Sequence, residues 1–153
     1  RYCISRAPIL NPFDAGLAWH RPLAWSADIL EQAVHLFRGT HDFTAFAALR
    51  GNEPRPIPEG YFRRTITQTQ VEQAGEHVFI TFTGTGFLYK MVRLMTGAAH
   101  EAARGKITLE ELARLINAPL PDDKSPFCAP PDGLTLMRVH YPEETFGDKK
   151  KIN

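Results

Sequence analysis

The sequence predicts an α+β domain with a largely antiparallel sheet and helices packed on one face. Two adjacent β-type segments, at about 61–73 and 77–85, are separated by a short Gly-containing turn and predict a hairpin. Apolar residues recur at helical spacing at about 27–38, 87–103 and 109–116. Because these helical segments do not alternate strictly with the β-type segments, an α+β fold is favoured over a parallel α/β fold.

The N-terminal part of the chain is predicted to form a strand and then a long loop. Residues 2–4 are β-formers. Residues 7–25 follow as a loop, and the large apolar rings of Trp19 and Trp25 are expected to anchor it to the core.

The helix predicted over 27–38 has a signal at each end. Ser26 is a favourable N-cap, and Gly39 is a typical residue at a helix C-terminus. Beyond it, Asp42 is expected to cap a further short turn. The apolar stripe of this helix is expected to comprise Ile29, Ala33, Val34 and Phe37.

The middle of the chain is predicted to expose a loop ahead of the hairpin and to form two helices after it. Residues 50–60 contain three prolines at alternate positions, which is typical of an exposed loop. The helix over 87–103 has one apolar face, and Gly105 ends it. Thr108 and Glu111 form a capping box for the third helix.

The last part of the chain is predicted to be a loop, a strand and a tail. Residues 118–133 are rich in proline, and residues 134–141 favour a final strand. Residues 143–153 are charged and are expected to form a frayed tail. This divides the chain into a domain over 1–142 and a tail over 143–153.

Composition excludes several classes of protein. The 153 residues, of which 43% are hydrophobic, suffice for one domain with its own core. Scattered Gly and Pro exclude collagen and coiled coil. The longest uncharged stretch, residues 77–89, is too short to span a bilayer. With 18 basic and 17 acidic residues, charge alone does not indicate a nucleic-acid partner.

Cysteine and histidine spacing argues against a disulfide or metal site. Cys3 and Cys128 lie far apart, and no HExxH or paired Cys/His spacing occurs, so no metal is expected. A reducing cytoplasm is the default location. Because Arg1, rather than Met, opens a strand-like segment, we expect the chain to be part of a longer protein.

Several short motifs have both a chemical and a structural interpretation. Cys128 and His140 could form a thiol nucleophile and its base, although a buried, inert cysteine is commoner. His41 and Asp42 could form an acid/base pair, but a helix cap is favoured. The glycines of residues 84–86 are likewise better explained by packing than by phosphate binding.

Basic and aromatic residues interleave along two parts of the sequence, as a surface that binds RNA would require. The alternative is an ordinary solvated rim, and charge alone does not decide between them. The candidate RNA-binding residues are Arg50, Arg55, Arg63, Arg64, Tyr89 and Lys90.

Arg93 differs from these residues because its neighbours in the predicted helix are apolar. A partly buried guanidinium needs a carboxylate or phosphate partner, unless it reaches solvent. No acidic residue stands three or four positions away. Its partner is therefore expected from elsewhere in the fold, from a ligand or from a segment outside this chain.

Three strings together resemble the C-terminal half of the TruA-type tRNA pseudouridine synthases. They are Gly-Thr-His-Asp-Phe-Thr-Ala-Phe at 39–46, Gly-Phe-Leu-Tyr-Lys-Met-Val-Arg at 86–93 and Ala-Pro-Pro-Asp-Gly-Leu-Thr-Leu at 129–136. The resemblance implies cofactor-free isomerisation of uridine to pseudouridine in the tRNA anticodon stem-loop, at positions 38–40. It also implies a homodimer.

The resemblance also implies roles for individual residues. Arg93 matches the arginine that pairs with the nucleophilic Asp of the family, and Leu134 matches a leucine of the uracil pocket. Tyr2 lies on the strand of the family's active-site tyrosine, although an ungapped register places that tyrosine just before residue 1.

The family's nucleophile string, Arg-Thr-Asp-x-Gly-Val-His, does not occur in the chain. Asp14 only echoes its middle and is not expected to be catalytic. We therefore expect the parent protein to be an enzyme and this chain alone to be inactive. The alternatives are a non-catalytic RNA-binding module and, from Cys128 and His140, a thiol hydrolase.

Overall fold

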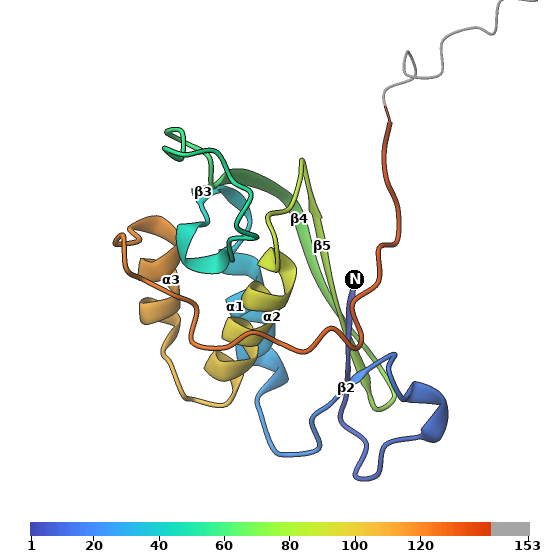
Figure 1. The fold of residues 1–153 in the computed structure, drawn as a ribbon. Helices are drawn as coiled ribbons and strands as arrows, with labels where there is room; N and C mark the ends of the chain where they lie inside the picture. Colours follow the sequence, from blue (N-terminus) through green and yellow to red (C-terminus); the bar gives the residue numbers. More distant parts are fainter. Residues whose placement is uncertain (142–153) are drawn as a thin grey trace, which may run out of the picture.

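The computed structural model describes residues 1–141, so the predicted tail over 143–153 lies outside the described residues. The elements in chain order are β1 Tyr2–Ser5, η1 Pro12–Asp14, β2 Trp19–His20, α1 Ala27–Leu36, β3 Gly39–Asp42, η2 Thr44–Phe46, β4 Arg63–Ala74, β5 His77–Gly84, α2 Met91–Ala103 and α3 Leu109–Asn117. The strands form one sheet in the order β2-β1-β5-β4-β3, and the helices lie together on one side of it (Figure 1). The predicted fold class is confirmed. No helix in the described part of the chain is long and apolar enough to cross a membrane.

The sheet is built around the predicted hairpin of β4 and β5. β1 pairs with β5 in antiparallel fashion, with Tyr2 opposite Ile80, and only the β1–β2 pairing is parallel. Alternate residues of β1 and β5 point to the helices and are buried, because one sheet face is the core face. These core residues are Tyr2, Ile4, Val78, Ile80 and Phe82.

Two strands were not predicted. β2 has only two residues, and it forms beside β1 where Trp19 enters the core. β3 covers the Gly39–Asp42 stretch, which has few β-formers and was predicted only to end a helix and cap a turn. It forms because β4 offers an edge, with Asp42 opposite Arg63.

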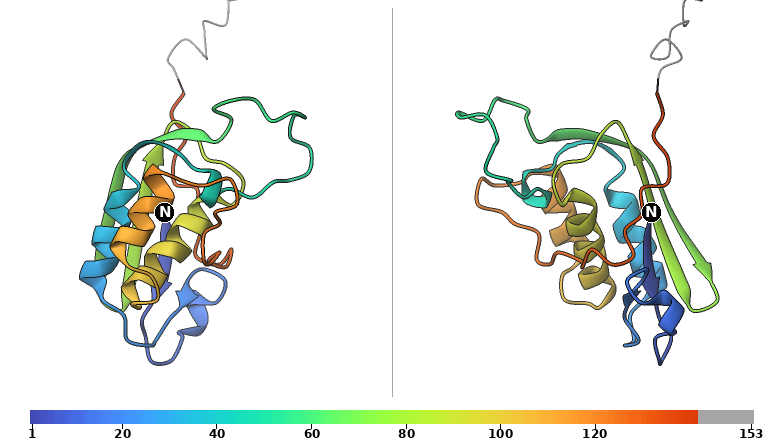
Figure 2. Two further views of the ribbon diagram at one scale, coloured as in Figure 1. Left: turned by 90° about the vertical axis from the view of Figure 1, so that its left-hand side faces the viewer. Right: turned by 45° about the vertical axis from the view of Figure 1, so that its right-hand side comes forward.

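The predicted helix caps of α1 and α3 are confirmed. The Ser26 hydroxyl accepts a hydrogen bond from the Ile29 N–H at 3.2 Å. The Thr108 hydroxyl accepts one from the Glu111 N–H at 3.1 Å, and the Glu111 carboxylate accepts one from the Thr108 N–H. The loop over residues 50–60 projects from the body, as predicted (Figure 2). Of the stripe predicted for α1, Ile29 is only half-buried, and Leu30 is fully buried instead.

The prediction that the second helix begins at residue 87 is wrong. α2 begins at Met91, because Lys90 has a left-handed backbone with φ of 59°. Residues 87–90 form a turn in which the Leu88 carbonyl accepts a hydrogen bond from the Met91 N–H. Tyr89 and Lys90 are therefore displayed on a turn rather than on a helix face.

The final strand predicted over 134–141 is also absent. Only Leu134 forms an isolated bridge, to Tyr2. The Thr135 N–H donates to the Arg1 carbonyl at 2.9 Å, which places Thr135 beside the first residue of the chain. Residues 136–140 belong to no strand of the described sheet, and a β-type segment forms a ladder only when it pairs with another strand.

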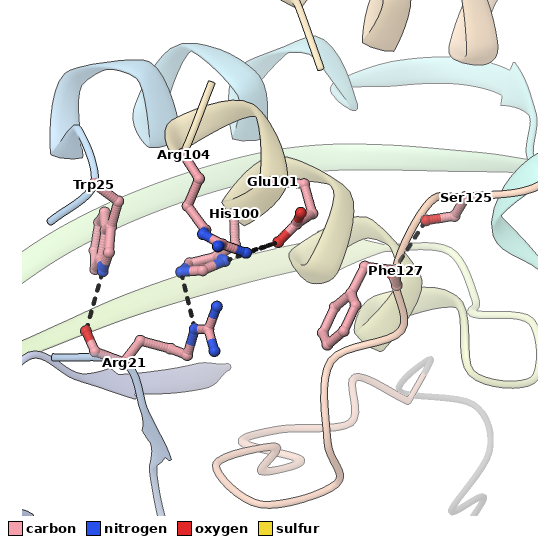
Figure 3. A network of polar contacts seen from close by, with 7 residues as sticks. All are labelled: Arg21, Trp25, His100, Glu101, Arg104, Ser125 and Phe127. Carbon is pink, nitrogen blue, oxygen red and sulfur yellow. Dashed lines mark hydrogen bonds and ion pairs between the residues drawn. The ribbon is translucent and has the colours of Figure 1, made fainter. Parts of the chain in front are cut away.

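Trp19 and Trp25 anchor the N-terminal loop to the core, as predicted, through the buried side chain of His100 on α2. The imidazole lies 4.6 Å from the Trp19 ring and 5.6 Å from the Trp25 ring, measured between centroids. Arg21 donates to its Nε2 at 3.4 Å, and Glu101 lies on its other side (Figure 3). Burial, with a further contribution from the Arg21 guanidinium, lowers the pKa of His100 to about 4.

This environment predicts that the protein loses stability in mild acid. Between pH 6.5, the ordinary pKa, and about pH 4, an unfolded chain binds a proton that folded His100 does not. The free energy of unfolding is therefore expected to be about 2 kcal/mol lower at pH 5 than at pH 7.5 on account of His100. Urea denaturation at both pH values measures this difference.

His100→Gln is expected to remove most of this pH dependence, because glutamine does not titrate. His140→Gln is the matched control, since His140 is exposed. An unchanged pH dependence in His100→Gln would show that other groups cause the acid sensitivity.

Candidate functional site

A groove opens where the end of β5, the turn before α2 and residues 134–140 meet. Its volume is about 680 Å³, which is within the range of roughly 300–1,000 Å³ that is common for ligand pockets. Apolar side chains, including Met91, Val92 and Leu134, supply much of its lining, and Arg93 and Lys90 contribute charge. It can therefore hold a flat, partly apolar group beside a cation.

Arg93 lies in the first turn of α2 and is half-buried. Its Nε donates a hydrogen bond to the Ala129 carbonyl at 2.7 Å. The Ala129 N–H in turn donates to the Arg93 carbonyl at 3.1 Å, so one residue holds both the side chain and the backbone of Arg93. Within residues 1–141, no carboxylate forms an ion pair with this guanidinium. Its terminal nitrogens can therefore take an anion at the groove.

Leu134 lines the groove because Gly133 holds it against β1. Gly133 has φ of +89°, and a Cβ there would lie 2.4 Å from the Cys3 carbonyl oxygen. The Cys3 N–H donates to the Gly133 carbonyl at 2.9 Å. Only glycine fits this backbone and this close approach.

Tyr2 lies beneath the groove rather than in its lining. The side chain is fully buried, and its hydroxyl donates to the Pro130 carbonyl at 2.8 Å. Burial raises the pKa of this hydroxyl, and the nearby Arg93 only partly opposes that shift. Tyr2 is thus a protonated donor that holds the segment leading to Leu134.

The structure brings three of the candidate RNA-binding residues together at the edge of the groove. The Arg50 guanidinium lies 4.7 Å from the Tyr89 ring centroid, and the Lys90 ammonium lies 5.4 Å from it. The Ala48 N–H donates to the Tyr89 carbonyl at 3.1 Å, which fixes the loop beside the turn. These contacts place two cations around one aromatic ring.

The described contacts of the other three candidates do not include the Tyr89 ring, and Arg64 lies beside Gly86 of the groove, where a Cβ would be 3.9 Å from its Nε. Arg63 and Arg64 are on β4, and the Arg64 guanidinium donates to the Tyr61 carbonyl at 2.9 Å. Arg55 is exposed on the 50–60 loop.

The competing chemical interpretations gain nothing from the geometry. In the described chain, Cys128 has one hydrogen bond, a 3.7 Å contact with the Ala129 carbonyl, and none to His140. Asp14 lies 2.8 Å from His77, which begins β5, whereas the groove is at the other end of that strand. Among residues 1–141 no cluster of His, Cys, Asp and Glu could hold a metal.

Two motifs that were expected to have structural rather than catalytic roles, the glycines of residues 84–86 and the His41–Asp42 pair, make structural contacts. A Cβ on Gly84 would lie 2.7 Å from the Thr65 carbonyl oxygen, so this glycine serves close packing. The Asp42 carboxylate accepts a hydrogen bond from the Thr44 N–H at 2.9 Å, and the His41 ring bonds the Arg38 carbonyl.

Comparison with known proteins gives a consistent result. The profile of a family described as tRNA pseudouridine synthase matches residues 33–142. The chain is 98% identical over 153 residues to a protein named tRNA pseudouridine synthase A from Akkermansia muciniphila, all of this chain and 58% of that protein. It is 34% identical to the protein of that name from Brevibacillus brevis, over 92% of the chain and 55% of the relative. It is 33% identical to the tRNA pseudouridine synthase A from Methylacidiphilum infernorum, over 94% of the chain and 54% of that relative. The chain thus spans a little over half the length of these relatives.

The role of Gly133 predicts a strong loss of stability on substitution. Gly133→Ala adds a clash with the Cys3 carbonyl to the cost of a left-handed backbone, and should lower the free energy of unfolding by well over 2 kcal/mol. Gly60→Ala is the matched control, since Gly60 also has positive φ but a Cβ there would meet nothing within 4 Å. It should cost only about 1–2 kcal/mol. Equal losses in urea denaturation would contradict the close packing of Gly133 on β1.

Proposed function

Because the chain belongs to the tRNA pseudouridine synthase family, we propose that its groove forms one side of an active site that isomerises uridine to pseudouridine in tRNA. The observation that supports this most is Arg93, a half-buried guanidinium that is held by a backbone carbonyl at the groove and has no acidic partner in the described chain. We propose that a nucleophilic Asp from outside this chain is that partner. This chain alone is then inactive.

In the proposed reaction, the carboxylate bonds to C1′ of the ribose as the bond between C1′ and N1 of uracil breaks. The uracil turns, its C5 bonds to C1′ and displaces the carboxylate, which is thereby regenerated, and the proton on C5 is released. Arg93 holds and charge-balances the carboxylate while the negative charge moves to uracil and back. No cofactor is needed, because the base keeps all of its atoms except that proton, which another proton replaces at N1.

The apolar part of the groove suits the base itself. The target uridine must leave its stack, which costs a few kcal/mol, and an apolar pocket beside hydrogen-bonding groups compensates for that cost. We propose that Leu134 packs against the uracil. Tyr2 acts through the carbonyl of Pro130, by holding the segment that carries Leu134.

We propose that the tRNA backbone follows the basic residues outward from the groove. Lys90 in the groove lining, Arg50 and Tyr89 beside it and Arg64 next to Gly86 would meet the tRNA near the target base, and Arg63 and Arg55 would extend the path. Aromatic rings flanked by cations serve both base stacking and phosphate contact. The anticodon stem-loop, at positions 38–40, is the proposed site of modification.

The remaining expectations on setting and assembly are also proposals. Two free thiols, Cys3 and Cys128, suit a reducing cytoplasm. A homodimer is proposed for the full-length protein. The alternative function is a non-catalytic RNA-binding module, in which Arg93 would hold a phosphate.

Replacement of Arg93 distinguishes these two functions. In the full-length relative from Akkermansia muciniphila, Arg93→Ala should lower kcat at least 100-fold while tRNA still binds, because the lost interaction acts on the reacting carboxylate. Arg93→Lys should also be impaired, since lysine lacks the planar fork. Tritium release from C5-labelled uridine in tRNA measures turnover. Arg104→Ala is the control, because Arg104 pairs with Glu101 away from the groove. Normal turnover at saturating tRNA together with weakened binding would favour the binding module.

The proposed RNA path predicts a change in salt dependence. Arg50→Ala combined with Arg55→Ala should weaken tRNA binding and lower the slope of log K against log salt by about 1–2. Fluorescence anisotropy across a salt series measures the slope. Arg104→Ala with Arg114→Ala removes the same charge from ion-paired sites and should leave the slope nearly unchanged. If the slope is unaltered in the Arg50→Ala, Arg55→Ala variant, these two arginines do not contact the tRNA and are ordinary solvent-exposed residues.

A further inference from the structure

Residues 125–130, here called the α2 strap, cross the surface of α2 beside Arg93. The Ser125 hydroxyl donates to the Leu94 carbonyl at 3.1 Å, and the Ser125 N–H donates to the Ala45 carbonyl at 2.8 Å. At the other end of the strap, Ala129 makes its two hydrogen bonds with Arg93. The strap is thus hydrogen-bonded to two successive residues of α2, Arg93 and Leu94, near the start of the helix.

The backbone of the α2 strap lies directly against Gly97 of the helix. A Cβ on Gly97 would lie 2.2 Å from the Phe127 carbonyl oxygen and 3.0 Å from the Ala129 nitrogen. Both are backbone atoms, so no side-chain rotation could relieve the overlap. The close approach therefore depends on glycine at this position, one helical turn beyond Arg93.

The α2 strap also contacts the N-terminal loop. The Phe127 ring stacks on the Trp19 ring, with centroids 5.7 Å apart and planes 9° apart. The Trp19 ring also contacts the buried His100 ring of α2, which Figure 3 shows together with Phe127. The strap is thereby held between α2 and the anchored N-terminal loop.

From this geometry we propose that Gly97 is a positioning residue for the isomerisation reaction, and that it acts on Arg93 through the α2 strap. The proposal rests on the proposed function of Arg93. The Ala129 carbonyl orients the guanidinium, and Gly97 sets where that carbonyl lies. A methyl group on Gly97 would displace the strap by about 1 Å, and misplacement on that scale is enough to cost about 100-fold in rate.

Gly97→Ala in the full-length relative tests this proposal. We expect kcat for tritium release to fall about 10- to 100-fold while KM for tRNA changes less than about twofold. The overlap with the backbone of the α2 strap should also lower the free energy of unfolding, and the preference of helices for alanine offsets only part of that loss. kcat is therefore measured at a temperature where circular dichroism shows the variant to be folded. Ser125→Ala adds no bulk and removes the hydroxyl's contacts with the Leu94 and Phe127 carbonyls, so it should lower kcat by a smaller factor of about 3.

Ala99→Gly is the matched control. Ala99 is buried on α2 but lies about 200° around the helix from Gly97, and the change to glycine destabilises the helix without touching the strap. Its kcat should equal that of the unmodified enzyme. An unchanged kcat in Gly97→Ala, or an equal loss in Ala99→Gly, would overturn the positioning role while the proposed function stands. Absence of tritium release from the unmodified full-length relative would overturn both.

Discussion

The two hydrogen bonds between Arg93 and Ala129 join the two walls of the groove. One wall is the start of α2, and the other is formed by residues 134–140, which the chain from Ala129 to Leu134 leads into. Tyr2 holds this chain at Pro130, and β1 holds it again at Gly133. If Ala129 moved, both the direction of the Arg93 guanidinium and the position of Leu134 would change with it. A cation and an apolar surface are thus kept in register by backbone carbonyls, which do not titrate and have few ways to move.

The strength of this arrangement comes from the core beneath it. α2 is buried along most of its length and packs against α1, so the helix that carries Arg93 is a rigid support. His100 fills the space between α2 and the N-terminal loop as a neutral ring between two indoles. A charged imidazole there would be costly. The stability of α2, which carries Arg93, therefore depends on His100 staying neutral, although His100 does not line the groove.

Features fixed by neighbouring residues could be predicted from the sequence. The caps at Ser26 and Thr108 and the central hairpin depend on side chains within a few positions. Local sequence patterns gave wrong predictions where distant partners decide the structure. These cases are the left-handed Lys90, the short β3 and the absent ladder after Leu134. At the site, an unpaired cation in an apolar stretch marked Arg93. Its partner, the Ala129 carbonyl, is backbone and leaves no trace in the sequence. In the sequence Gly97 is only a glycine within a predicted helix. The need for glycine there comes from the backbone of the α2 strap, which packs against it.

We propose, above all, that this chain supplies the arginine side of a uridine-isomerising site whose nucleophile lies elsewhere in the protein. Tritium release from C5-labelled uridine in whole tRNA, with the full-length relative and this chain measured side by side, tests this most directly. We expect release by the full-length relative and none by this chain. Release by the chain alone would contradict the proposal, since one of its own acids, such as Asp14, would then have to act as the nucleophile.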